Sequence, residues 1–231
     1  MKGTTFAVIG VGKYGYEIAQ KLAQKGAQVY AFDVDEEKID NIKDEVAFAV
    51  TLDSTDEKAL LSQKIEDVDA AIVAIGENFE AVILTAVHLQ EIGVKRVIAR
   101  ASGKQQRMIL EKIGIKEILS PEDEVAKSVV EKLINPNILS SLQLPDDYEI
   151  VEVKAPKGVF SRNIKELALR GNYRLTLIAI KREFEKENGE EKTLEQHIIG
   201  VPSYDTQILE KDTLLLFGTG NDVQRFLEIN E

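Results

Sequence analysis

The stretch that decides the fold is Phe6-Ala-Val-Ile-Gly10-Val-Gly12-Lys-Tyr-Gly15, followed by Tyr30-Ala-Phe-Asp33-Val-Asp35. An apolar run leads into a G-x-G-x-x-G turn and a helix-length segment, and a second apolar run ends in an acid about 20 residues after the glycines. The first glycine allows a tight turn, the second lets the backbone approach a pyrophosphate, and the third lets the helix pack closely on the sheet. This order predicts a dinucleotide-binding unit in which Asp33 accepts hydrogen bonds from ribose hydroxyls.

Composition narrows the class of protein. The chain has 231 residues, of which 44% are hydrophobic and 30% charged, which is typical of a soluble globular protein with one large or two small domains. It contains no cysteine, so we expect neither disulfides nor a thiolate site, as suits a reducing cytoplasm. We find no signal peptide pattern and no apolar run near the ~20 residues that span a bilayer. The net charge of −11 argues against binding to nucleic acid.

Residues 4–134 alternate apolar runs with amphipathic stretches of helix length, which predicts a Rossmann-like α/β fold with a doubly wound parallel sheet. The expected strands are Thr5–Ile9, Gln28–Phe32, Ala47–Thr51, Ala70–Ile75, Val97–Arg100 and Glu117–Leu119. The expected helices are Tyr14–Gln24, Glu36–Asp44, Glu57–Gln63, Phe79–Glu91, Gln105–Ile113 and Pro121–Ile134. Ligands of such sheets bind at the carboxyl ends of the strands. Those ends carry Gly10, Asp33, Asp53, Gly76 and Arg100.

The pattern changes after the last of these helices, because Asn135-Pro-Asn137 stops it. We therefore expect a nucleotide-binding domain over residues 1–134, a linker or crossover over 135–147 and a small α+β domain over 148–231. The apolar residues of the middle segment should pack on something, such as a second subunit. The expected elements of the small domain are strands at 149–154, 174–181, 196–200 and 213–218 and helices at 163–170 and 222–227. The charged segment 183–192 is predicted to be an exposed hairpin loop, and Gly218-Thr-Gly220 a strand-to-helix turn.

The order of motifs resembles a known family. The motifs are the two stretches quoted above, Ala74-Ile-Gly76, Leu110–Ile115, Ser120-Pro-Glu122, Leu169-Arg170-x-x-Tyr173 and Thr176–Ile180. Together they resemble the RCK (regulator of K⁺ conductance) proteins of the Ktr/Trk potassium uptake systems, of the KtrA/KtrC type. The resemblance covers essentially the whole chain.

The resemblance implies a regulatory role rather than catalysis. It implies a cytoplasmic gating subunit, peripheral to the inner face of the cell membrane, that binds ATP or ADP, or alternatively NAD or NADH. It implies homodimers that assemble into an octameric ring and dock on a membrane K⁺ channel or transporter subunit (KtrB/TrkH-like). The small domain resembles RCK C-domains, some of which bind cyclic di-AMP, and Arg170, Ile164 and Pro202 match loosely there.

The resemblance also implies site residues in four groups. The phosphate turn is Gly10, Val11, Gly12, Lys13, Tyr14 and Gly15. The ribose contacts are Asp33, Val34 and Asp35, and Asp53 and Ser54 lie against the base. Ile75 and Gly76 form the opposite wall, and Lys13 and Arg100 reach the terminal phosphate. Glu122 is implied as the ligand of a divalent or sodium ion near that phosphate.

The sequence itself leaves open several alternative roles for these residues and for the protein. Capping explains Glu122 without a metal, because Ser120-Pro121 starts a helix and acids favour its first turn. Asn78 reads as a helix cap, and His88 and His197 as structural or solvent-facing residues. Two cations favour ATP or ADP over NAD(H), since a terminal phosphate uses them better than an internal pyrophosphate. The rival functions are an NAD(P)-dependent oxidoreductase, for which no catalytic pair is evident, an NAD(H)-linked redox sensor, and a sensor that acts on transcription.

Overall fold

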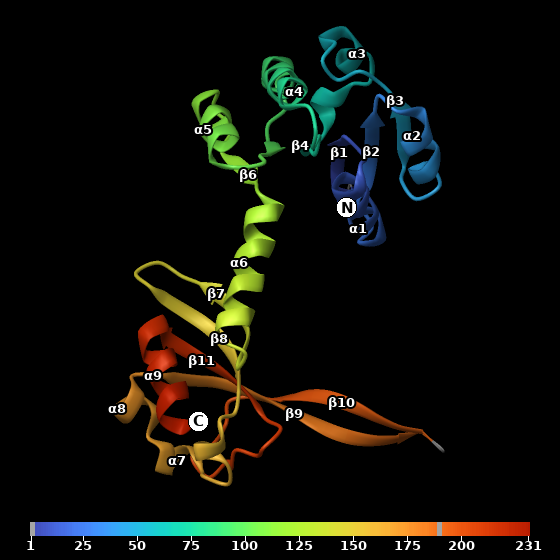
Figure 1. The fold of residues 1–231 in the computed structure, drawn as a ribbon. Coiled ribbons are helices and arrows are strands. Elements are labelled where there is room, and N and C mark those ends of the chain that lie inside the picture. The colour runs from blue at the N-terminus through green and yellow to red at the C-terminus, as the bar shows by residue number, and fades with distance from the viewer. Residues whose placement is uncertain (1–2, 189–190) are drawn as a thin grey trace. The chain divides into compact units, whose positions relative to one another are not determined.

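The chain divides into two compact units, Met1–Asp123 and Glu124–Glu231. The computed structural model describes residues 3–188 and 191–231, without the side chains of residue 131 and of residues 185–194. Figure 1 labels the elements of both units. Each unit is built around its own sheet and core.

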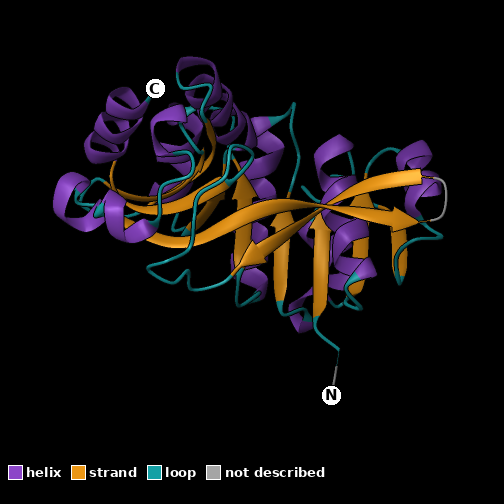
Figure 2. Ribbon diagram, turned by 90° about the horizontal axis from the view of Figure 1, so that it is seen from below, coloured by secondary structure: helices purple, strands orange, loops and turns teal. Residues whose placement is uncertain are grey.

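The first unit is a parallel sheet whose strand order is β3-β2-β1-β4-β5-β6, and the arrows run in one direction (Figure 2). The strands are β1 (Thr5–Ile9), β2 (Gln28–Asp33), β3 (Phe48–Thr51), β4 (Ala70–Val73), β5 (Val97–Arg100) and β6 (Glu117–Leu119). The helices of this unit are α1 (Lys13–Gln24), α2 (Glu36–Ile42), α3 (Glu57–Ser62), α4 (Phe79–Ile92) and α5 (Lys104–Lys112), and α6 (Pro121–Ile134) begins in it and continues past its last residue. The order reverses between β1 and β4, which is where such sheets open a crevice for ligands. The Rossmann-like fold predicted from the sequence is confirmed.

Alternation along the strands explains why helices cover both faces. Ala7 and Ile9 of β1 pack with α3, α4 and α5, whereas Val8 packs with α1 and α2. Successive side chains of a strand point to opposite faces, so a strand that is apolar at every position needs cover on both. The two buried clusters therefore fix the sheet between helix layers and leave its carboxyl edge for the loops.

The second unit holds an antiparallel sheet, in the described residues, of order β10-β9-β11-β8-β7. Its strands are β7 (Ile138–Gln143), β8 (Tyr148–Lys154), β9 (Thr176–Asn188), β10 (Glu191–Ile199) and β11 (Thr213–Thr219). The helices α8 (Leu169–Tyr173) and α9 (Gly220–Asn230) pack on one core with α7 (Ile164–Leu167), around buried residues such as Leu216 and Phe226. The predicted strand-to-helix turn at Gly218–Gly220 is confirmed, since the Thr219 side chain accepts a hydrogen bond from the Asp222 N–H. Strand β7 lies in the segment expected to be a linker, and the boundaries at 134 and 148 stay a prediction.

Two local predictions in this unit differ from the structure. The charged segment 183–192, predicted to be an exposed hairpin loop, does belong to a hairpin, but 183–188 and 191–192 are not loop, because they continue β9 and β10 as a paired ladder (Figure 1), while residues 189–190 lie outside the described residues. A backbone ladder forms without apolar side chains, which is why composition misled the prediction. The helix expected over 163–170 is two short helices, because Ala168 adopts a left-handed conformation with φ of 42° and ends the first.

None of the helices in the described ranges combines the length and the apolar character that a membrane crossing requires.

Candidate functional site

A cavity of about 820 Å³ opens at the carboxyl edge of the parallel sheet. It lies where β1, β2, β3, β4 and β5 end, so the fold brings together loops that are distant in sequence. The predicted site residues that line it are Gly10, Gly12, Lys13, Tyr14, Asp33, Val34, Asp53, Ser54, Ile75, Gly76 and Arg100. Val11, Gly15, Asp35 and Glu122 do not line it.

The glycine turn at the end of β1 uses its three glycines differently. Gly10 has φ of +89°, and a Cβ on it would come within 2.8 Å of the Ile75 nitrogen. A Cβ on Gly15 would come within 1.9 Å of the Gly10 carbonyl oxygen, so the chain itself requires a glycine there. A Cβ on Gly12 would meet nothing within 4 Å. The chain leaves space at Gly12, where α1 begins without a side-chain cap, and a helix N-terminus of this kind suits an anion.

Asp33 is held rigidly at the end of β2. Its side chain is only 7% exposed, and its Oδ2 accepts a hydrogen bond of 2.8 Å from the Val11 N–H. Its Oδ1 accepts one of 3.0 Å from the Asp35 N–H, and the Lys38 ammonium lies 3.6 Å away. A carboxylate oxygen has a second lone pair, so Asp33 can still accept hydrogen bonds from hydroxyl groups in the cavity.

Asp35 caps helix α2. Its side chain accepts a hydrogen bond of 3.0 Å from the Glu37 N–H at the start of α2. The cap turns Asp35 away from the cavity lining. Asn78 likewise caps α4 by accepting from the Ala81 N–H, as predicted, although it also lines the cavity.

The loop after β3 forms one wall and is folded on itself. The Thr55 hydroxyl and the Thr55 N–H both donate to Asp53 Oδ1, at 2.7 Å and 2.9 Å, and lower the pKa of Asp53 below its ordinary value. Ser54 is buried, and its hydroxyl lies 2.7 Å from the Thr85 hydroxyl of α4. The wall therefore carries an ionised carboxylate held in a fixed orientation.

The opposite wall centres on Arg100. Its guanidinium carbon lies 5.5 Å from the centre of the Tyr14 ring, and Gly76 makes room for it, because a Cβ there would be 2.9 Å from Arg100 Nη1. Its Nη2 donates to Glu122 of α6. In the described part of the chain, the buried Arg100 Nε has no hydrogen-bond partner. Arg100 thus reaches the cavity from one side and the first turn of α6 from the other.

Glu122 has a carboxylate that stays ionised. Its own backbone N–H holds the pKa of Glu122 below its ordinary value; burial opposes this effect, and the Arg100 guanidinium adds to the lowering. The residues that the structure describes contain no group of three or more His, Cys, Asp or Glu side chains able to hold a metal ion. A cation at Glu122 would need further oxygen ligands from a bound phosphate or another copy of the chain.

Sequence reasoning missed part of the lining and the residues behind it. The residues that line the cavity but were not predicted to do so are Ile9, Lys38, Thr55, Ala74, Glu77, Asn78 and Ala81. Lys38 could have been found, because a residue three positions after a helix cap lies over that cap. Thr85 and His88 carry no local signal, since they contact the wall loop from a helix more than thirty residues away in sequence.

The C-terminal residues that were matched to a cyclic dinucleotide site lie in one part of the second unit. The Ile164 and Lys165 N–H groups donate to the carbonyl oxygens of Thr206 and Tyr204, at 3.2 Å and 3.1 Å. The loop that contains Pro202 therefore runs beside α7, and Arg170 lies on the adjacent α8.

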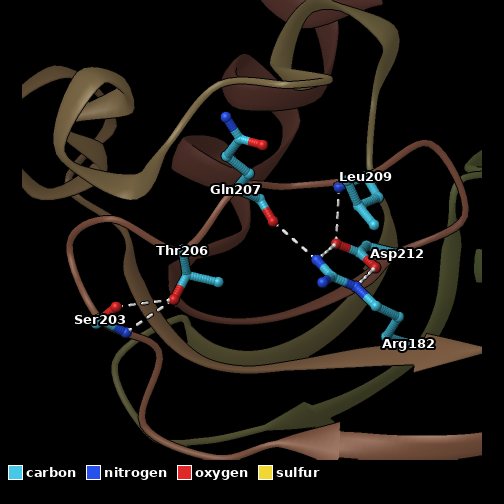
Figure 3. A network of polar contacts seen from close by, with 6 residues as sticks. All are labelled: Arg182, Ser203, Thr206, Gln207, Leu209 and Asp212. Atoms are coloured by element: carbon cyan, nitrogen blue, oxygen red, sulfur yellow. Dashed lines mark hydrogen bonds and ion pairs between the residues drawn. The ribbon is translucent and has the colours of Figure 1, made fainter.

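That loop is anchored by an ion pair between the half-buried Arg182 and the buried Asp212 (Figure 3). Arg182 of β9 donates to both carboxylate oxygens of Asp212, at 2.7 Å each, and to the Gln207 carbonyl at 2.8 Å. Asp212 also accepts from the Leu209 N–H at 2.8 Å. Asp212 raises the pKa of Arg182 through its hydrogen bonds, so the guanidinium stays charged. The pair fixes residues 207–212 against the sheet.

Comparisons with known proteins agree with this architecture. Residues 6–121 match the model of the TrkA-N domain family. The chain is 34% identical over 221 residues to the Ktr system potassium uptake protein C of Bacillus subtilis (strain 168), covering 96% of this chain and 95% of that protein. The NAD(P)-binding domain of an exopolyphosphatase-related protein from Archaeoglobus fulgidus matches with a TM-score of 0.50 and 27% identity, over 56% of this chain and 96% of that domain. A GsuK channel shares the fold, with a TM-score of 0.66 and 14% identity over 100% of this chain and 40% of its own.

Proposed function

This chain belongs to the TrkA-N domain family and is KtrA/KtrC-like, and from that premise we propose that it is the regulatory subunit of a potassium uptake system. In this role it binds a nucleotide in the cavity of the first unit and controls K⁺ transport by a membrane channel or transporter subunit. It performs no catalysis of its own.

The observation that carries the proposal is the extent of the likeness to the Bacillus subtilis potassium uptake protein. That likeness covers 96% of this chain and 95% of the relative, so it includes both units. Many unrelated enzymes share a Rossmann-like domain, and a match confined to the first unit would support nucleotide binding alone. A shared second unit supports a shared regulatory role.

The cavity fits an adenine nucleotide laid across three neighbouring strands. Phosphates over Gly12 would meet the N-terminus of α1, and ribose hydroxyls would meet Asp33 at the end of β2. The base would then lie against residues 53–55, because β3 is the next strand of the sheet. The likeness to an NAD(P)-binding domain at 27% identity supports this class of ligand.

We place ATP or ADP ahead of NAD(H) because of the charges at the phosphate end. Lys13 and Arg100 both line the cavity, and a terminal phosphate offers more anionic oxygens to two cations than an internal pyrophosphate does. The Nε of Arg100 offers a further donor. NAD or NADH remains the alternative ligand, and with it a redox-linked sensor or an oxidoreductase.

A bound triphosphate would also give Glu122 a second task. Arg100 is the partner that Glu122 shares with the cavity, so a phosphate that draws the guanidinium inward would free the carboxylate. Glu122 would then be one ligand of a divalent or sodium ion whose other ligands are phosphate oxygens. Since α6 begins at Pro121, this exchange would change the first turn of α6 with the ligand.

The same premise extends to assembly and place in the cell. We propose a homodimer that builds an octameric ring on the cytoplasmic side of the membrane, against a K⁺ channel or transporter subunit. Cyclic di-AMP is the proposed second ligand, at the surface formed by Ile164, Arg170 and the loop that contains Pro202.

Calorimetry on nucleotide-stripped protein tests the proposal. ATP, ADP, NAD⁺ and NADH would each be titrated into the parent and into Asp33→Ala. We expect ATP and ADP to bind best and Asp33→Ala to lose most of the affinity. The membrane partner reconstituted in vesicles should then show K⁺ flux that depends on this chain and on the nucleotide.

Three outcomes would count against the proposal. Flux that ignores the chain would contradict regulation. Tightest binding of NADH would favour the redox alternative, and hydride transfer to a carbonyl substrate would favour the oxidoreductase.

A further inference from the structure

Two side chains of α4 contact the wall loop from behind, on successive residues. Thr85 Oγ1 lies 2.7 Å from Ser54 Oγ, and both residues are buried, Thr85 completely. His88 Nε2 lies 3.1 Å from the Thr55 carbonyl oxygen. Thr85 and His88 are three positions apart, so they share one face of the helix. This face of α4 therefore contacts the loop at two successive residues, Ser54 and Thr55.

The roles of the two groups follow from their chemistry. A carbonyl oxygen only accepts, so the His88 Nε2 carries the proton and donates it to Thr55. A hydroxyl has one proton and two lone pairs, so either member of the Ser54–Thr85 pair can donate to the other. The Ser54 hydroxyl and the Thr55 carbonyl oxygen therefore both have a partner on α4, which lowers the cost of placing these polar groups of the loop against the helix.

Among the residues that the structure describes, none anchors the loop in the same way from its cavity side. Asp53, Ser54 and Thr55 all line the cavity, and the hydrogen bonds of Asp53 run within the loop, to Thr55. The loop shape is therefore set by its own turn and by α4. The rest of α4 is fixed by core residues such as Ala86 and Leu89, which gives the two polar contacts a rigid base.

We propose that Thr85 and His88 are positioning residues that hold the 53–55 wall against the base of a bound nucleotide and so set the affinity for base-containing ligands. This inference rests on the nucleotide site proposed above. It adds that helix α4, which contains no glycine motif, decides how well the far end of the ligand fits. The phosphate end, at Gly12 and Lys13, lies at the start of α1 and should not respond to it.

The test compares variants by nucleotide affinity and by stability. Thr85→Val keeps the shape and removes the hydroxyl, and His88→Leu removes the donor. Thr85→Ser and His88→Gln restore a hydroxyl and an amide N–H at the same reach. The matched controls are the exposed Thr4→Val and His197→Gln. Each protein is titrated with ATP, ADP and NADH, and with tripolyphosphate, which has no base or ribose.

We expect Thr85→Val and His88→Leu to bind the tightest nucleotide of the parent about tenfold more weakly, as the loss of one buried hydrogen bond implies. Tripolyphosphate binding should not change, and the conservative variants should recover at least half of the loss on a logarithmic scale. Hydrogen exchange of the ligand-free protein should be faster at residues 54–56 in Thr85→Val than in Thr4→Val.

The outcomes separate the two proposals. If the parent binds nucleotide and both α4 variants bind it equally well at a temperature where they are folded, the positioning role is overturned and the nucleotide site stands. Equal losses for ATP and tripolyphosphate would mean a general destabilisation and would also overturn it. If the parent binds no nucleotide, the proposed function itself fails, and faster exchange at residues 54–56 would then report only on loop stability.

Discussion

Replacing Gly12 and Gly15 by alanine, one at a time, separates ligand binding from folding. A Cβ at position 12 meets nothing within 4 Å, and the backbone there has φ of −63° and ψ of −175°, which alanine adopts without strain. Alanine stabilises by about 0.4–1 kcal/mol through the unfolded chain, and it is a poorer helix cap than glycine by a similar amount. We therefore expect the stability of Gly12→Ala to lie within about 1 kcal/mol of the parent.

Gly15→Ala is the opposite case. Its Cβ would lie 1.9 Å from the Gly10 carbonyl oxygen, against a floor of 3.0 Å for real contacts, so helix and turn must separate by about 1 Å. The nearest obstacles are backbone atoms, which cannot rotate away as a side chain can. Overpacking costs about 1–3 kcal/mol, and a backbone clash belongs at the upper end. A loss of about 3 kcal/mol corresponds to a fall in melting temperature of roughly 10 °C.

For nucleotide affinity, in contrast to stability, we expect a large effect from Gly12→Ala. In Gly12→Ala the added methyl group occupies the space where a diphosphate approaches the start of α1, and losing a hydrogen bond to a charged group costs about 1.5–3 kcal/mol. The Kd for nucleotide should therefore rise roughly 10- to 100-fold. Gly200→Ala, at an exposed glycine of the second unit with open space around its Cβ, is the matched control.

Thermal unfolding measures the stability of each variant, and calorimetry on the same samples measures its affinity for nucleotide. A Gly12→Ala protein that binds like the parent would refute the placement of phosphates at this turn. A Gly15→Ala protein as stable as the parent would refute the packing argument.

Three further changes test other contacts. Asp33→Ala should raise the Kd for nucleotide at least about tenfold by calorimetry, because it removes the carboxylate at the ribose position, and an unchanged Kd would move the ribose elsewhere. Arg182→Met should lower the free energy of unfolding by about 3 kcal/mol in urea, because it leaves the buried Asp212 carboxylate unpaired; an unchanged midpoint would show that the ion pair does not matter. Thr55→Val should raise the pKa of Asp53 toward its ordinary 3.8 in an NMR titration. Because the folded pKa is lowered, the stabilisation is present above about pH 4 and is lost as the pH falls through the folded pKa, so parent and variant with the same acid limb would contradict the assignment.

The first sheet was predictable because its signals are local. Each strand is an apolar run of a few residues, each helix follows within a short turn, and the glycines of the β1–α1 turn are dictated by contacts inside that turn. Asp33 could be singled out because Asp35 is better placed to cap α2, and the structure shows that cap. These residues lie at strand ends, and parallel strands place their ends on one edge.

The second unit was less predictable because its signals conflict. Residues 183–188 are strongly charged, yet they pair along the backbone of β10, and the ladder continues into a sheet anchored by β11. Strand β7 follows a helix-stopping proline, and its sequence Ile138-Leu-Ser-Ser-Leu-Gln143 shows no apolar–polar alternation by which to recognise it. Ala168 adopts a left-handed conformation that alanine rarely shows, and no residue pattern announces it.

The cavity is lined both by residues that belong to a recognisable motif and by residues that do not, and this difference bears on which ligand the cavity prefers. In the proposed site, the glycine turn and Asp33 select only a class of ligand, since any nucleotide has phosphates and a ribose. The wall at residues 53–55 is contacted from behind by Thr85 and His88, which belong to no motif and reach the loop through the fold alone. Two chains can therefore share the whole fingerprint and still differ in the nucleotide they prefer, because a single change on α4 alters the wall and leaves every motif intact.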